Sequence, residues 1–215
     1  MKVRILTAIA LAACSTTTPP PRQPTPGSRG LRADQHLDAA QAHERRAQEL
    51  ARWPETRPGG AGAFDDPRAG LWYRRIDTAE EQARAAAGHR GAAADLHAEY
   101  EAACGEAPAE QVSVSPLQRH GLGGTNITDG VRVFLRPEAG PADQLLQDIR
   151  CHRAWMMLGE SGMEDCPLDL AGIRVVAHGD PAGISVEITV ADPKLVPELQ
   201  RRAAHDLEAA VRRQP

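Results

Sequence analysis

The chain has 215 residues, which is enough for one ordinary domain with an accessory region. Its 25 basic and 29 acidic residues give a formal net charge of −4 at pH 7, and this argues against general nucleic-acid binding, which needs clustered Lys and Arg. Aromatic residues make up only 3% of the chain, so Leu, Val, Ile and Ala must fill the core.

The first fifteen residues have the pattern of a secretory signal peptide. Lys2 and Arg4 carry positive charge, and the apolar run that follows is too short to span a bilayer. The segment closes with Leu-Ala-Ala-Cys14, which resembles the lipobox of bacterial lipoproteins. The resemblance implies cleavage before Cys14 and acylation of its sulfur, as with palmitate. Ser15 stands where an aspartate would favour the inner membrane, so the resemblance implies sorting to the outer membrane.

The lipobox leaves one alternative open. Ala10-Leu-Ala12 also satisfies the small-x-small rule of ordinary signal peptidase, which would release a soluble periplasmic protein. In the lipoprotein interpretation, residues 1–13 are the signal peptide, and residues 14–33 are the lipidated cysteine and a tether rich in Pro and Thr. The expected location is the bacterial outer membrane, lipid-anchored, facing the periplasm or the cell surface.

Residues 34–104 are predicted to form an Ala-rich helical hairpin. Small and apolar residues recur at spacings of three and four from about Asp34 to Trp53, which is typical of a helix. A loop rich in Pro and Gly follows over residues 55–69. The second helix is predicted from about Thr78 to Cys104, with Thr78 and Glu81 as a capping box. Alanine on both helices allows close approach but buries little area per residue.

Residues 105–215 are predicted to form a small α+β domain of order β-α-β-β-α, with two helices covering one face of the sheet. Alternating apolar residues predict strands at 131–135, 173–177 and 184–190, and Val112 and Val114 suggest a further edge strand. Helices are predicted at 142–158 and after the cap formed by Asp192 and Pro193. The Gly-rich segment 121–125 is interpreted as a loop.

Three cysteines remain if Cys14 is lipidated, namely Cys104, Cys151 and Cys166. The bacterial periplasm is oxidising, so at least one disulfide is expected among them. We favour Cys151–Cys166, because this bond would pin the loop 159–165 to the helix before it, while pairs with Cys104 stay open. The odd cysteine is then a free thiol, an intermolecular bridge or a metal ligand.

The densest group of reactive side chains comprises Cys151, His152, Met156 and Cys166. Thiolate, imidazole and thioether are the donors that select Cu or Zn, and His152 and Met156 share one face of a helix. Two cysteines joined in a disulfide cannot coordinate as thiolates, however, and methionines commonly fill core gaps. A structural disulfide beside a core histidine is therefore the favoured interpretation, and a metal site is the alternative.

The histidines of the hairpin do not form a chelating pair within one helix. His36 and His43 are seven residues apart, which separates them by roughly 10 Å along the axis. A metal would therefore need ligands from both helices. Gly88 and Gly91 flank His89, and we expect them to let the partner helix approach closely.

The enzyme motifs that this sequence partly matches are incomplete. His43-Glu-Arg-Arg-Ala47 lacks the second histidine of a zinc-protease helix, and His97-Ala-Glu99 is not followed by the Pro-Cys-x-x-Cys of a deaminase. We therefore expect a non-enzymatic module without a cofactor.

The expected partners are the membrane, through acylated Cys14, and an envelope protein or cell-wall component, through the C-terminal domain. The alternative is a periplasmic soft-metal binding protein with His152, Met156 and one or more of Cys104, Cys151 and Cys166 as ligands. A hydrolase whose site has no local motif is a third option.

Overall fold

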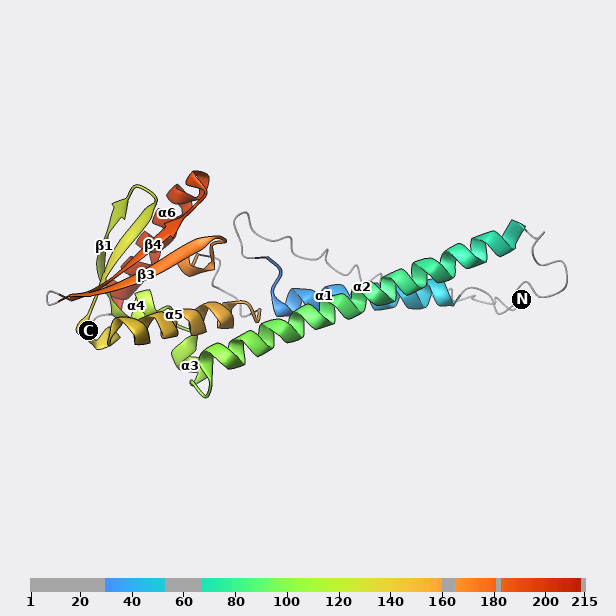
Figure 1. The fold of residues 1–215 in the computed structure, drawn as a ribbon, viewed down its shortest axis with the longest axis horizontal. Coiled ribbons are helices and arrows are strands. Elements are labelled where there is room, and N and C mark those ends of the chain that lie inside the picture. Colours follow the sequence, from blue (N-terminus) through green and yellow to red (C-terminus); the bar gives the residue numbers. More distant parts are fainter. Residues whose placement is uncertain (1–29, 53–66, 160–164, 181–182, 214–215) are drawn as a thin grey trace, which may run out of the picture.

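Two long helices form an antiparallel hairpin that projects from an α+β domain (Figure 1). The computed structural model describes residues 30–52, 67–159, 165–180 and 183–213. The hairpin consists of α1 (Ala33–Ala51) and α2 (Pro67–Cys104). The domain contains α3 (Ala109–Val112), α4 (Pro116–His120), β1 (Gly121–Ile127), β2 (Gly130–Leu135), η1 (Pro137–Ala139), α5 (Ala142–Met156), η2 (Pro167–Asp169), β3 (Ile173–Asp180), β4 (Gly183–Val190), η3 (Pro193–Leu195) and α6 (Val196–Arg212). The predicted fold class, a helical hairpin followed by a small α+β domain, is confirmed.

The hairpin is packed in alternating small and polar layers. Ala33 and Ala40 of α1 and Ala86 and Ala93 of α2 are almost completely buried. Each of these alanines lies three or four positions from a histidine or glutamine that contacts the other helix. Buried alanines and polar contacts therefore alternate along both helices. At 1.5 Å per residue, the 38 residues of α2 extend about 57 Å.

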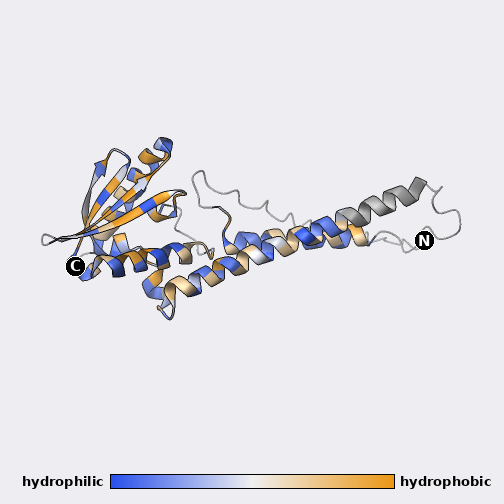
Figure 2. Cartoon of the chain, in the orientation of Figure 1, coloured by the Kyte–Doolittle hydropathy of each residue, from blue (hydrophilic) through white to orange (hydrophobic). Residues whose placement is uncertain are grey.

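The four strands form one antiparallel sheet in the order β1-β2-β4-β3. Two units of the same kind, β1-β2-α5 and β3-β4-α6, follow each other in the chain. Val133 of β2 lies opposite Val186 of β4 in the register, at the centre of the sheet. The alternation of buried and exposed residues in β2 and β4 shows that one face of the sheet is covered. Hydrophobic and hydrophilic residues alternate along these strands (Figure 2).

The core lies between that face of the sheet and the helices. Leu145 and Ile149 of α5 and Leu199 of α6 are fully buried against the strands. Leu117 of α4 and Leu168 of η2 belong to the same cluster. Two helices thus cover one sheet face as predicted, and α4 adds a short third element to that layer.

The domain has one strand that the sequence analysis interpreted as a loop. Residues 121–127 form β1, which pairs with β2 and has a register irregularity between Gly121 and Gly123. Backbone pairing with a strong neighbour stabilises a strand whose own side chains carry no alternating pattern. The predicted edge strand is wrong, since Val112 ends α3 and Val114 lies in the segment before α4.

The start of the second helix also differs from the prediction. The helix begins at Pro67 and continues through Thr78, so the proposed capping box at Thr78 and Glu81 is not a helix terminus. Part of the predicted loop 55–69 and all of residues 1–29, including Cys14, lie outside the described residues. The same holds for most of the predicted loop 159–165.

The disulfide joins the hairpin to the domain. Cys104, the last residue of α2, is bonded to Cys151 in α5, and Cys166 is a buried free cysteine. The favoured pair Cys151–Cys166 is therefore wrong. The reason is tertiary: α2 packs against α5 and brings Cys104 beside Cys151, whereas Cys166 lies among His152 and Asp206 in the core.

Removal of this disulfide should destabilise the protein substantially. The bond closes a loop with a sequence separation of 47, for which the loss of chain entropy corresponds to about 4 kcal/mol. We expect the C104S/C151S variant to lose a free energy of unfolding of that order in urea titrations. The matched control is the wild type with the disulfide reduced, which should lose a similar amount. A C104S/C151S variant as stable as the oxidised wild type would show that the bond contributes nothing through chain entropy.

Candidate functional site

The predicted reactive cluster forms part of a buried polar network. Cys166 Sγ lies 3.6 Å from Nε2 of His152 and 4.0 Å from Oδ2 of Asp206. These three side chains come from the segment before η2, from α5 and from α6. All three are buried, so the network lies inside the domain and not in a cleft.

The imidazole of His152 is fixed by a backbone carbonyl. Its Nδ1 lies 2.7 Å from the carbonyl oxygen of Val112, which can only accept, so Nδ1 carries the proton and donates it. Nε2 then has the free lone pair and accepts from the thiol of Cys166. Burial lowers the pKa of His152 to about 4, so the ring is neutral at pH 7. The ring also stacks on Trp155, with centroids 5.9 Å apart.

Burial also shifts the pKa values of Cys166 and Asp206, the other two members of the network. It raises the pKa of the Cys166 thiol far above its ordinary value, and the neighbouring Asp206 carboxyl raises it further. The thiol therefore stays protonated at neutral pH and is a poor nucleophile and metal ligand. Burial also raises the pKa of Asp206, whose Oδ1 accepts a 2.7 Å hydrogen bond from Nε2 of Gln118.

The four residues of the predicted cluster, Cys151, His152, Met156 and Cys166, are separated in the structure. His152 and Cys166 are in contact, whereas Cys151 is bonded to Cys104 and cannot act as a thiolate. Met156 is fully buried in the hydrophobic core. Asp206 and Gln118 were not predicted as members, because no local spacing connects α6 and α4 with Cys166.

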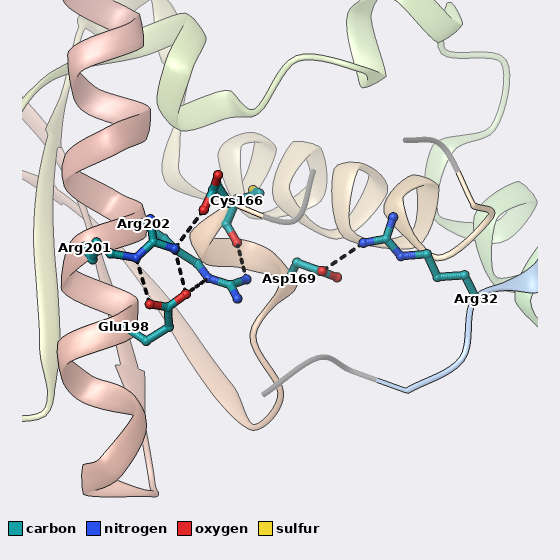
Figure 3. Close-up of polar contacts among 7 residues, drawn as sticks. Arg32, Cys166, Asp169, Glu198, Arg201 and Arg202 are labelled. Carbon is teal, nitrogen blue, oxygen red and sulfur yellow. Dashed lines mark hydrogen bonds and ion pairs between the residues drawn. The ribbon is translucent and has the colours of Figure 1, made fainter. Parts of the chain in front are cut away.

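A junction of ion pairs surrounds the segment that carries Cys166 (Figure 3). On one side, Arg202 donates from Nε to Glu198 at 2.6 Å and from a guanidinium nitrogen to the carbonyl oxygen of Cys166 at 3.4 Å. Hydrogen bonds from Arg201 and Arg202 lower the pKa of Glu198 to about 2. On the other side, Arg32 contacts Asp169 at 3.1 Å, and both side chains are largely buried.

The backbone strengthens the junction at the first residue of α1. The amide of Ala33 donates to the carbonyl oxygen of Met157 at 2.8 Å. Together with the contact between Arg32 and Asp169, this bond attaches the start of α1 to the end of α5 and to η2. Because the disulfide attaches the end of α2 to α5, the domain holds the base of the hairpin at both of its helices.

Three histidines of the hairpin meet across the two helices. Nδ1 of His36 lies 2.9 Å from Nδ1 of His89, and the rings of His43 and His89 stack with centroids 5.4 Å apart. In the next layer, Nδ1 of His43 lies 2.7 Å from Oε1 of Gln82. Partial burial and the neighbouring rings of His36 and His43 lower the pKa of His89.

The glycines beside His89 do not explain this approach. Gly88 and Gly91 are exposed, and an added Cβ at either position would meet no atom within 4 Å. The expectation that they line the interface is wrong. The buried alanines allow the helices to approach.

A shallow groove of about 360 Å³ lies between the end of α2 and α5. Its lining consists of Glu99, Ala102, Ala103, Gln147, Arg150 and Arg153. None of the predicted site residues lines it.

The comparisons with known proteins give no identification. No family model, no curated protein and no solved structure matches this chain. Over the described residues, no helix combines the length and apolar character needed to cross a membrane, and no three His, Cys, Asp or Glu side chains are arranged to hold a metal ion.

Replacement of Asp206 by asparagine should stabilise the protein at neutral pH. The raised pKa means that the folded state binds the Asp206 proton more tightly than the unfolded state, so ionisation costs stability as pH rises above the ordinary carboxyl pKa. D206N removes that cost and keeps the oxygen that accepts from Gln118. Its free energy of unfolding should exceed that of the wild type near pH 7, and the difference should shrink near pH 4.

The matched control is D165N. Arg201 lowers the pKa of Asp165, so this substitution removes a favourable charge and should bring no gain near pH 7. A loss of stability in D206N that is equal near both pH values would mean that Asp206 contributes through the contact of its Oδ2 with Cys166 and not through its charge.

Proposed function

We propose that this protein is a lipid-anchored, non-enzymatic protein of the bacterial envelope that serves as a binding or structural module. The anchor is the acylated Cys14, and the membrane is the outer membrane. The partner is another envelope protein or a cell-wall component. The single observation that carries the proposal is the Leu-Ala-Ala-Cys14 sequence, and the junction at Arg32 and Ala33 is where the described chain enters the fold.

The junction determines how an anchored chain would present its two parts. A tether that ends at Arg32 arrives where the base of the hairpin meets the domain, and not at the distant end of α2. The hairpin is therefore no stalk between membrane and domain. Both parts extend from one attachment point, and the hairpin reaches away from the domain as an arm.

The lengths agree with such an arrangement. Residues 15–32 would reach roughly 55 Å if fully extended at about 3.1 Å per residue. The helix α2 is about as long, at about 57 Å. An arm of this length can contact a partner well beyond the radius of the domain, in a position limited by the tether.

The use of the reactive side chains supports a non-enzymatic role. The side chains of Cys166, His152 and Asp206 contact one another inside the core, where no substrate reaches them. The thiol of Cys166 is neutral and is therefore a poor nucleophile. The same contacts speak against the soft-metal alternative at this cluster. Two of its proposed sulfur ligands, those of Cys104 and Cys151, are joined in a disulfide.

The anchor is tested by mass spectrometry of the protein purified from the membranes of a Gram-negative host. We expect a mature chain that begins at Cys14 and carries acyl groups on that residue. The S15D variant should stay acylated but move to the inner membrane, whereas C14S should lose the acyl groups. A mature chain with an unmodified Cys14 would rule out the lipid anchor.

The arm is tested by distance measurements between spin labels at exposed positions of α1 and α5, introduced as R45C and D143C. The two links at the base of the hairpin should give one narrow distance distribution. Breaking both links with R32Q and C104S/C151S should widen it. The control R46Q breaks the exposed ion pair between Arg46 and Glu49 and should leave it narrow. A broad distribution in the otherwise unchanged protein would contradict the rigid arm.

A further inference from the structure

The contact between His36 and His89 places two nitrogen donors face to face. The two Nδ1 atoms are 2.9 Å apart, and they belong to different helices of the hairpin. A hydrogen bond between them requires one ring to carry its proton on Nδ1 and the other to carry it on Nε2. The pair therefore shares one proton, and that proton occupies a position where two lone pairs can converge.

We propose that His36 and His89 form a binding site for a divalent transition-metal ion such as Zn²⁺, Cu²⁺ or Ni²⁺. The ion is ligated by Nδ1 of both rings, and the shared proton moves by exchange with solvent to Nε2 of the ring that carried it, so both imidazoles stay neutral. Imidazole nitrogen is a preferred ligand for these ions, whereas Mg²⁺ and Ca²⁺ prefer oxygen, and no carboxylate takes part in this pair.

The distance between the two nitrogens suits a shared ion, and the rings must turn to receive it. Zinc binds imidazole nitrogen at about 2.0–2.1 Å, so two nitrogens on one tetrahedral ion lie about 3.3 Å apart. The present separation of 2.9 Å is close to that value. A tetrahedral ion lies about 1.2 Å to one side of the line between its two nitrogens, so each ring must also swing by about 35° to aim its lone pair at the ion. Both rings are only partly buried, so their side chains have room to turn, and water can complete the coordination.

The side chains around His36 and His89 do not occupy the Nδ1 atoms of these two rings. His43 stacks on His89 and commits its own Nδ1 to Gln82, so its Nε2 carries the remaining lone pair. Arg90 and Glu44 form an ion pair across the helices near this layer. Their charges compensate each other, so neither repels nor attracts an ion at the two rings strongly. With two protein ligands and open positions for water, the site binds its ion exchangeably, unlike a closed four-ligand structural site.

The sequence supplies a replacement that preserves the packing. The neighbouring layer of the hairpin already pairs a histidine with a glutamine, at His43 and Gln82. H36Q and H89Q therefore recreate a layer of a kind that this hairpin tolerates while removing one nitrogen ligand each. H97Q is the matched control, because His97 is exposed and lies on the same helix two turns beyond His89.

The experiment is a calorimetric titration of the purified full-length protein, without a histidine tag, with ZnCl₂ near neutral pH. We expect one zinc ion per chain, a loss of affinity of about tenfold or more in H36Q and in H89Q, and unchanged binding in H97Q. Circular dichroism confirms that the helix content of the variants is retained. Unchanged zinc binding in either H36Q or H89Q overturns the proposal, and so does the absence of binding by the wild type.

A second measurement needs no variant that might lose its fold. In long-range ¹H–¹⁵N spectra of the imidazole groups, zinc should move the Nδ1 resonances of His36 and His89 and leave those of His97 in place. Movement confined to other histidines overturns the proposal even if zinc binds.

Discussion

Cys104 is the last residue of α2, and its bond to Cys151 fixes the end of a 38-residue helix to the domain. The placement of the hairpin depends on this bond together with the contacts of Arg32 and Ala33 at the start of α1. The hairpin's buried interface consists largely of alanine, which removes little apolar surface from water per residue. A long helix pair with so small a core gains from attachment at its base, where the disulfide acts on α2 and Arg32 acts at the start of α1.

The domain compensates for its few aromatic residues with buried polar contacts. His152, Asp206 and Arg202 are almost inaccessible, yet each has partners: the Val112 carbonyl and the Cys166 thiol for His152, Gln118 for Asp206, and Glu198 for Arg202. Such groups cost desolvation, and their hydrogen bonds recover that cost only in one arrangement. The network therefore fixes how η2 lies between α5 and α6, which apolar packing alone would specify less strictly.

The sequence was sufficient for the elements whose own pattern is strong. The strands around Val133 and Val186 and the helices α1, α5 and α6 follow from periodicity. The sequence was insufficient where a segment's structure depends on another segment of the chain that packs against it. Residues 121–127 become a strand through backbone pairing with β2, and Cys104 finds Cys151 because α2 packs on α5. The same limit applies to the reactive cluster, since nothing in the spacing connects Cys166 with Asp206.

The histidine layers fix the register of the hairpin at the contact that carries the proposed metal site. A polar pair inside an alanine interface fixes the register of two helices, because any shift by one turn would leave its hydrogen-bonding groups unpaired. His36 with His89 and His43 with Gln82 are two such pairs, with buried alanines between them. Only the first has nitrogen donors on both sides. A glutamine at position 89 would meet the need for register equally well, so register alone does not explain the second histidine.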